Sequence, residues 1–196
     1  MIFDAVVLAG GRSSRLGGHP KSALIFEGET LLQHTLNAVQ DARQIVVVGE
    51  PGATAVSPAT VVVREDPPFG GPVAAIAAGL AAATGDTSEW VVLLACDMPF
   101  VAQAVPVLLA NADHDGALAV DADGREQYLL ACYRRAALDD ALNLQDGAVT
   151  GMSVRQLIAG LTTTLVTVPA GSSTDIDTWD DAARLGISPE TGARHG

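Results

Sequence analysis

The residues with the clearest chemical potential lie in a glycine-rich segment close to the N-terminus. Between positions 8 and 24 the chain reads LAGGRSSRLGGHPKSAL, which holds two pairs of glycines, two arginines and Lys21. Glycines let the backbone approach a ligand closely and adopt positive φ, so that amide groups can point at one anion. Lys21 is the only lysine of the chain, and an ammonium contacts phosphate as a compact point charge. The segment predicts a phosphate-binding loop, although ordinary exposed loops have a similar composition.

Several familiar motifs are excluded. A Walker A loop needs a Gly-Lys dipeptide and a dinucleotide-binding fingerprint needs Gly-x-Gly, and neither pattern occurs in the sequence. The Gly-x-Ser-x-Gly pattern of many serine hydrolases is also missing. The four histidines are scattered without metal-binding spacing, so we assign none of them a role.

Carboxylates form the second group of candidates. Asp97 comes almost directly after the apolar run 91–95, and a residue at the carboxyl end of a buried strand lies where ligands bind in open α/β sheets. Carboxylate oxygens, together with substrate phosphates, are the ligands that Mg²⁺ prefers. Asp97 and Asp177 could equally cap the helices that follow them, and Asp66 could be a solvated acid beside a turn.

The elements that must position these residues can be outlined from apolar runs and helical spacing. Strands are expected at Ala5–Leu8, Gln44–Val48, Thr60–Val63, Val91–Ala95, Ala117–Val120, Leu129–Tyr133 and Leu161–Val168. Helices are expected at Leu31–Ala42, Val73–Ala83, Ala102–Asn111, Ala136–Leu144, Val154–Ala159 and Trp179–Leu185. Several runs are apolar almost throughout, as in strands buried on both faces of a parallel sheet. The alternation predicts a three-layer, Rossmann-like α/β fold: an open, mostly parallel sheet with helices on both faces. The turn at 121–124 predicts a hairpin.

Composition and charge narrow the class of protein. The formal net charge is −12, so a field attractive to nucleic acid or to anionic lipid is absent overall, and we expect neither as a partner. The longest apolar helical segment is shorter than the roughly 20 residues that span a bilayer, and no signal peptide precedes the first strand. We therefore expect a cytoplasmic protein, in which Cys96 and Cys132 are reduced core residues. Residues 1–187 are expected to form one domain, and residues 188–196 a disordered tail.

The glycine-rich segment resembles the signature loop of the nucleoside triphosphate transferases related to molybdenum cofactor guanylyltransferase. The residues that carry the resemblance are Leu8, Ala9, Gly10, Gly11, Ser13, Arg15, Leu16, Gly17 and Lys21. Similar segments follow in the same order over residues 4–187. The resemblance implies the fold of the nucleotide-diphospho-sugar transferases and the transfer of GMP from GTP to the phosphate of molybdopterin, with release of pyrophosphate. It also implies Mg²⁺ as cofactor and other molybdenum cofactor enzymes as partners.

The same resemblance implies roles for individual residues. The catalytic residues would be Arg15, Lys21 and Asp97. The metal ligands would be Asp97, in a Cys-Asp-x-Pro segment, and Asp177, in an Asp-x-Asp-Thr segment. The nucleotide contacts would be Leu8, Ala9, Gly10, Gly11, Lys21, Gly49, Asp66, Gly71 and Asp97. Residues 124–135, with Arg125, Gln127 and Tyr133, resemble the region that shapes the acceptor pocket.

Three departures from the family pattern limit what the resemblance implies. They are Pro20 in place of an acidic residue before the lysine, Gly49 in place of an asparagine after the second strand, and Asp175 and Asp177 in place of asparagines. The pair Gly10–Gly11 favours guanine, because similar enzymes that use cytidine tend to have Ala-Gly there. The alternatives are a cytidylyltransferase, a sugar-phosphate or polyol-phosphate nucleotidyltransferase of the same fold, and a nucleotide-binding module without catalysis.

Overall fold

A computed structural model of the chain describes residues 1–11, 13–52 and 54–189. The strands are β1 (Phe3–Leu8), β2 (Ile25–Phe26), β3 (Glu29–Thr30), β4 (Ile45–Val48), β5 (Val61–Val63), β6 (Trp90–Ala95), β7 (Gly116–Val120), β8 (Glu126–Arg134) and β9 (Thr163–Thr167). The α-helices are α1 (Leu31–Ala38), α2 (Pro72–Ala82), α3 (Val105–Asn111), α4 (Arg135–Asn143), α5 (Val154–Leu157) and α6 (Trp179–Arg184). Short 3-10 turns occur at Ser14–Leu16, Lys21–Ala23 and Val101–Gln103.

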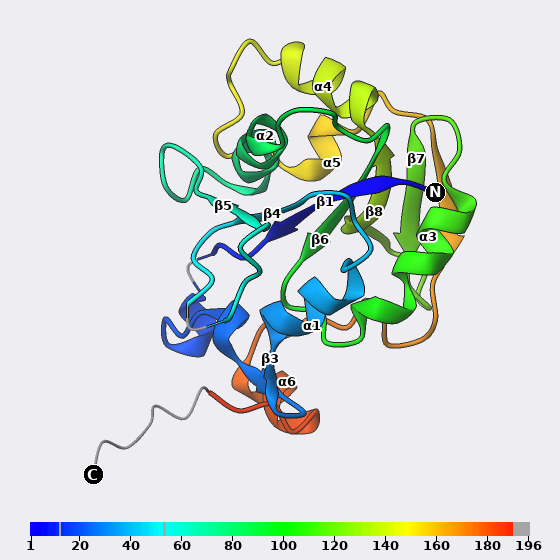
Figure 1. Cartoon of the computed structure of the whole chain (residues 1–196). Coiled ribbons are helices and arrows are strands. Elements are labelled where there is room, and N and C mark those ends of the chain that lie inside the picture. The colour runs from blue at the N-terminus through cyan, green and yellow to red at the C-terminus, as the bar shows by residue number, and fades with distance from the viewer. Residues whose placement is uncertain (12, 53, 190–196) are drawn as a thin grey trace.

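Seven strands form one sheet in the order β5-β4-β1-β6-β8-β7-β9. The pairs β1–β4, β1–β6, β4–β5 and β7–β9 are parallel, whereas β8 runs antiparallel to both β6 and β7. Helices α2, α4 and α5 cover one face of the sheet, and α1 and α3 cover the other (Figure 1). The predicted three-layer, mostly parallel α/β fold is confirmed, and so is the hairpin at 121–124, which joins β7 to β8.

The central strand β1 shows why the runs are apolar throughout. Val6 and Leu8 pack into the core on the side of α2, whereas Ala5 and Val7 pack into the core on the side of α1. A strand covered by helices on both faces has no solvent-facing positions, so it does not alternate. The exception in β1 is the buried Asp4, whose carboxylate accepts hydrogen bonds from the backbone N–H and the hydroxyl of Ser88, at 2.8 and 3.0 Å.

The element boundaries differ from the predicted ones in a few places. The helix predicted at 31–42 ends at Ala38, and the one predicted at 102–111 begins as an α-helix only at Val105. Pro106 explains the second difference, because proline has no N–H to donate and is tolerated in the first turn of a helix. The strand predicted at 129–133 extends over 126–134, since β8 is paired along both edges. No helix in the described part of the chain is long and apolar enough to cross a membrane.

A third, smaller core lies outside the two main layers. It is formed by Leu16, Leu24, Phe26, Leu31, Ile176, Ala182 and Ile187. These residues join the glycine-rich loop, the unpredicted hairpin of β2 and β3, and the C-terminal segment with α6, all at the lower end of Figure 1. Ser188, the first residue of the predicted tail, exchanges two backbone hydrogen bonds with Ile25, at 2.7 and 3.0 Å. The tail from residue 190 onward lies outside the described residues.

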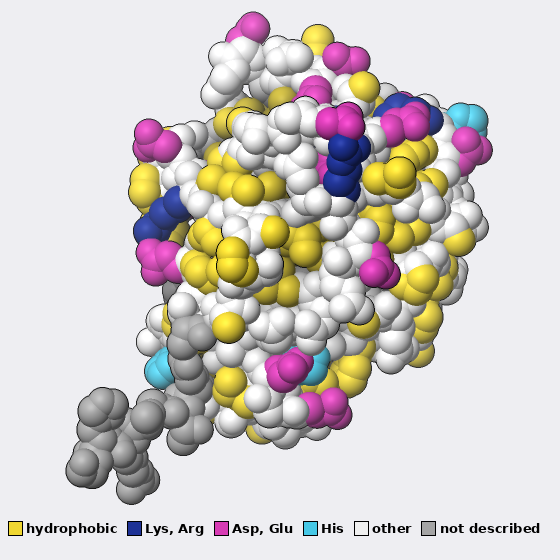
Figure 2. Space-filling view, viewed as in Figure 1, with side chains coloured by type: hydrophobic (Ala, Val, Ile, Leu, Met, Phe, Trp, Pro, Cys, Tyr) yellow, Lys and Arg dark blue, Asp and Glu magenta, His cyan; other side chains and the backbone are white. Residues whose placement is uncertain are grey.

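The basic side chains at the surface are accompanied by acidic ones. Exposed ion pairs join Arg43 to Asp86, Arg64 to Glu50, Arg134 to Glu89 and Arg184 to Asp181. On the face shown in Figure 2, the few Lys and Arg side chains lie beside Asp or Glu side chains. This pairing agrees with the strongly negative net charge of the chain.

Helix α2 packs so closely on the sheet that no side chain fits at Gly79. A Cβ there would lie 2.5 Å from Cγ1 of Val6 and 3.0 Å from Cγ2 of Val48.

Alanine in place of glycine usually stabilises a helix interior by about 0.5–1 kcal/mol. Here we expect Gly79→Ala to lower the free energy of unfolding by about 1–3 kcal/mol, because the core must shift to admit the methyl group. Urea denaturation measures this change. In the control Gly160→Ala, the added Cβ meets nothing within 4 Å, and a change of at most about 0.5 kcal/mol is expected. A stabilised Gly79→Ala protein would contradict the close packing.

Candidate active site

The glycine-rich loop leaves the carboxyl end of β1 and leads through two 3-10 turns to the hairpin of β2 and β3. Gly17 and Gly18 have φ of 65° and 84°, in the left-handed region that glycine adopts without strain. Leu16, the last residue of the first turn, is fully buried in the third core and anchors the loop there. Lys21 begins the second turn directly after Pro20. Arg12, the other arginine of this loop, lies outside the described residues.

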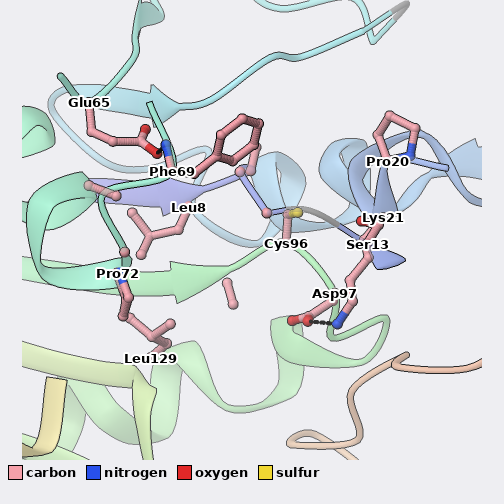
Figure 3. A pocket seen from close by; sticks show the side chains of 16 residues that line it. Leu8, Ser13, Pro20, Lys21, Glu65, Phe69, Pro72, Cys96, Asp97 and Leu129 are labelled. Atoms are coloured by element: carbon pink, nitrogen blue, oxygen red, sulfur yellow. Dashed lines mark hydrogen bonds and ion pairs between the residues drawn. The ribbon is translucent and has the colours of Figure 1, made fainter. Parts of the chain in front are cut away.

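Lys21 is the point at which three distant segments meet. Its Nζ donates to Oδ2 of Asp97 at 2.7 Å and to Oδ1 of Asp177 at 2.5 Å. Asp97 follows β6, the neighbour of β1 in the sheet, and Asp177 precedes α6. Arg15 lies at the outer side of the same group, with Nη1 3.4 Å from Oδ2 of Asp177 and a side chain that is 73% exposed. The three residues predicted to be catalytic are therefore brought together with the second predicted metal ligand, and Figure 3 shows the Lys21–Asp97 contact.

Three carboxylates form a compact acidic group at this place. Each of Asp97, Asp175 and Asp177 offers an oxygen, and these oxygens lie within 4.8 Å of one another. Between the last two, Ile176 is fully buried in the third core and its N–H donates to the backbone oxygen of Asp97 at 3.1 Å. The buried Ile176 thus ties the C-terminal segment to the end of β6. Asp175 was not among the predicted ligands, although the Asp-x-Asp spacing was visible in the sequence.

The structure also decides whether the aspartates are helix caps. The N-cap of α6 is Thr178, which forms a capping box with Asp181. After Asp97, the 3-10 turn begins at an N-cap on Phe100 and α3 begins at an N-cap on Ala104. The side chains of Asp97 and Asp177 instead point at Lys21. The capping interpretation of both aspartates is therefore wrong.

The electrostatics of the group follow from crowding of like charges around one cation. Burial by itself lowers the pKa of Lys21, but the charge of Asp97 and the hydrogen bonds to Asp177 and Asp97 outweigh it, so the pKa is raised. The pKa of the Asp175 carboxyl is raised by partial loss of hydration and by the charges of Asp97 and Asp177, although the residue as a whole is exposed. Burial also raises the pKa of Cys96, which therefore remains a thiol at neutral pH. The available donors are carboxylate oxygens, which fit a hard divalent cation such as Mg²⁺.

Two adjoining cavities open at the carboxyl edge of the sheet, and Asp97 of the acidic group lines the first. The first has a volume of about 360 Å³ and the second about 390 Å³, each in the usual range for a small-molecule site. They share the loop residues 9–11 and Pro20, as well as Glu65 and Phe69. Figure 3 shows Glu65 and Phe69 on the side of the first cavity opposite Lys21 and Asp97.

Most of the predicted nucleotide contacts line these cavities. The first is lined by Leu8, Ala9, Gly10, Gly11, Lys21, Gly71 and Asp97, and the second by Gly49. Asp66 is exposed and is not among the lining residues. Its neighbour Glu65 is buried, lines both cavities and accepts a hydrogen bond from the N–H of Phe69 at 3.0 Å. Neighbouring residues of an extended segment face opposite sides, so the sequence alone did not tell which of the two acids faces inward.

The structure gives a physical reason for Gly49 in place of an asparagine. Gly49 has φ of 126°, and a Cβ there would lie 2.7 Å from the carbonyl carbon of Ala9 and 2.7 Å from the nitrogen of Gly10. The N–H of Ala9 also donates to the carbonyl oxygen of Val48 at 2.8 Å. The loops after β1 and β4 therefore touch through their backbones.

A third cavity, of about 460 Å³, adjoins the first and shares Pro72, Ala95, Asp97 and Leu129 with it. Asp97 and Asp175 line it together with Gln127, one of the residues of the predicted acceptor region. Arg125 is instead exposed beside Asp123. Tyr133 lies in the core, where its hydroxyl donates to the carbonyl oxygen of Tyr128 at 3.2 Å. Asp97 thus lines two adjoining cavities, which suits a reaction that joins a phosphate donor in one to an acceptor in the other.

Comparison with known proteins identifies the family. Residues 5–164 match the model of the MobA-like NTP transferase domain. The matched range includes Lys21 and Asp97 but ends before Asp175 and Asp177. A molybdenum cofactor guanylyltransferase of Pseudomonas entomophila (strain L48) is 33% identical over 142 residues, which cover 70% of this chain and 73% of that protein.

Solved structures agree in fold over nearly the whole chain. A crystal structure of a protein from Mycobacterium sp. strain JC1 is 27% identical, with a TM-score of 0.71 and coverage of 93% of this chain and 94% of that one. The 2-C-methyl-D-erythritol 4-phosphate cytidylyltransferase of Thermus thermophilus is 22% identical, with a TM-score of 0.70 and coverage of 94% and 97%. The loop, the strand order and the matched range lead to one conclusion: the chain belongs to the family of MobA-like NTP transferase domains.

Proposed function

We propose that the chain, as one domain over residues 1–187, is a cytoplasmic nucleotidyltransferase that transfers GMP from GTP to the phosphate of molybdopterin and releases pyrophosphate. The observation that carries the proposal is the meeting of Lys21 with Asp97 and Asp177, together with two adjoining cavities that Asp97 lines in common. The name of the Pseudomonas relative, a molybdenum cofactor guanylyltransferase, supports the choice of substrates. Other molybdenum cofactor enzymes are the partners that we propose for the product.

The triphosphate is assigned to the side of the glycine-rich loop. Gly10 and Gly11 line the first cavity with their backbone, and Lys21 lines it as well. Arg15 is the most exposed member of the group, and its long side chain can turn from Asp177 to a phosphate. Loop amides and two cations would hold the donor phosphates while charge redistributes during the transfer.

The acceptor is assigned to the third cavity, which adjoins the first and is also lined by Asp97. A phosphate nucleophile is already largely ionised at neutral pH, since its second pKa lies near 6. Attack on the α-phosphorus therefore needs no general base. The work left to the protein is to align the two phosphates and to balance their charge.

Asp97, Asp177 and Asp175 are the residues that would hold Mg²⁺. Their clustered oxygens provide the hard donors that this ion prefers. A bound magnesium ion supplies positive charge that Lys21 alone does not provide against a triphosphate and three carboxylates. The protein contributes by fixing Asp97 at the end of β6 and by holding the Asp-x-Asp segment through Ile176.

Substrate choice is the first property to test. Purified protein with Mg²⁺ and molybdopterin should release pyrophosphate with GTP, with kcat/KM at least about tenfold above that with CTP, ATP or UTP. A coupled pyrophosphate assay measures this, with sugar phosphates and polyol phosphates as alternative acceptors. Absence of release with every triphosphate and acceptor would rule out the enzyme. A preference for CTP, or for a sugar or polyol phosphate, would replace the proposed substrates by those of another transferase.

The roles of Lys21 and Asp97 are tested by substitution. Lys21→Ala and Asp97→Ala should each lower kcat/KM on the order of 100-fold or more, because each removes a charge next to the reacting phosphates. Both proteins should remain folded, as circular dichroism can verify, because the two side chains line a cavity at the carboxyl ends of the strands and do not belong to the apolar cores. Asp86→Ala, at an aspartate 82% exposed and paired with Arg43, is the control and should keep normal turnover. Normal turnover in either of the first two variants would remove that residue from the mechanism.

Dependence on metal is the third test. Chelation with EDTA should abolish pyrophosphate release, and added Mg²⁺ should restore it. Asp175→Asn and Asp177→Asn should each raise the Mg²⁺ concentration for half-maximal rate several-fold, since each removes a charged oxygen ligand. Asp180→Asn alters an acid in the first turn of α6, outside the acidic group, and should leave that concentration unchanged. If Asp175→Asn behaves like Asp180→Asn, then Asp175 is not a ligand.

A further inference from the structure

Lys21 is bound by the same carboxylates that would hold the metal ion. Its Nζ lies 2.7 Å from Oδ2 of Asp97 and 2.5 Å from Oδ1 of Asp177, and both residues belong to the acidic group. The side chain of Lys21 is 22% exposed and that of Asp97 is 18% exposed, so solvent screens this pair less than it screens a pair at the open surface. In the protein without ligands, the ammonium provides the charge that balances these carboxylates.

A divalent cation and this ammonium compete for the same groups. Mg²⁺ binds carboxylate oxygens at about 2.0–2.1 Å, so an ion held by Asp97 and Asp177 would come close to the present position of Nζ. Two positive charges a few ångströms apart repel each other strongly where solvent is partly excluded. The metal and the bound ammonium therefore do not share the two carboxylates without loss of affinity.

The ammonium of Lys21 also has a second possible binding partner, a phosphate in the first cavity. It lines the first cavity together with Gly10 and Gly11, where the triphosphate is assigned. The backbone on its C-terminal side is fixed, because Ser22 is buried and Leu24 is buried in the third core. The four-carbon side chain is flexible, so the ammonium can move from the aspartates to a phosphate while the loop stays in place. Arg15 differs, because its side chain is 73% exposed and its Nη1 lies at the longer distance of 3.4 Å from Oδ2 of Asp177.

We propose that Lys21 is a placeholder for the divalent cation: it occupies the carboxylates until a nucleoside triphosphate draws it away and frees them for the metal. This inference rests on the proposed function, since it requires a triphosphate in the first cavity. Its consequence is that metal and nucleotide strengthen each other's binding, by the same factor in both directions. Without nucleotide, the acidic group binds the metal weakly.

The test measures metal affinity in the protein without nucleotide, using Mn²⁺ as the probe and isothermal titration calorimetry as the readout. Lys21→Met removes the charge and keeps an unbranched side chain, and it should bind Mn²⁺ at least about tenfold more tightly than the unaltered protein, within the usual range of coupling between sites. Lys21→Gln is the second neutral variant and should show the same gain if Lys21→Met does not fold. Lys21→Arg keeps the charge and should show no such gain.

Two control variants separate occupancy of the carboxylates from a general change in charge. Arg43→Met removes one positive charge beside Asp86, away from the acidic group, and should leave the Mn²⁺ affinity unchanged. Arg15→Met removes a charge that touches the group only from its exposed side, and should have a much smaller effect than Lys21→Met. Unchanged or weaker Mn²⁺ binding in both neutral Lys21 variants would overturn the proposal, and so would an equal gain in Arg15→Met.

The outcome is independent of turnover. If pyrophosphate is released from GTP but the neutral Lys21 variants gain no Mn²⁺ affinity, the placeholder is wrong and the proposed function stands. If the neutral variants gain affinity but no triphosphate is turned over, Lys21 does occupy the metal site and the proposed function is wrong.

Discussion

The ion pairs of Lys21 with Asp97 and Asp177 are the interaction around which the site is built. They require three segments that are far apart in the sequence to meet at one edge of the sheet. Parallel pairing of β1 with β6 brings the glycine-rich loop beside Asp97, because the carboxyl ends of neighbouring parallel strands lie together. The third core then brings the C-terminal segment to the same edge through the buried Ile176. The main sheet thus positions Lys21 and Asp97, and the third core positions Asp177.

The sequence predicted the elements that are governed by burial and by short-range rules. Strands such as β1 and β6 are covered on both faces, so their apolar runs were visible, and the glycine-rich loop was visible from its composition. The hairpin of β2 and β3 was missed because two-residue strands are too short to show a period. The antiparallel course of β8 between two parallel strands depends on long-range pairing that no local pattern records. In the site, the resemblance named Lys21 and Asp97, and the structure brings the two side chains together. It named Asp66 and not Glu65, because which of these two acids faces the cavities depends on the orientation of the backbone.

The acidic group combines a part of the chain that the family model matches with a part that it does not. Asp97 lies inside the matched residues 5–164, and Asp175 and Asp177 lie beyond them. The two parts are joined by the ion pairs of Asp177 with Lys21 and Arg15, by backbone hydrogen bonds from Ile176 to Asp97 and between Ile25 and Ser188, and by packing in the third core. The geometry of the carboxylates of Asp175 and Asp177 therefore depends on the integrity of this small apolar core as well as on the main sheet, which positions Asp97.

The contact between Gly49 and the backbone of Ala9 and Gly10 bears on how such sites diverge. Any side chain at position 49 meets main-chain atoms, which have no alternative rotamer to adopt. The asparagine of similar proteins is therefore accessible to this chain only together with a displacement of the loop after β1. A change in the loop after β4 therefore requires a matching change in the loop after β1. Redesign of the nucleotide pocket has to exchange the two loops as a pair.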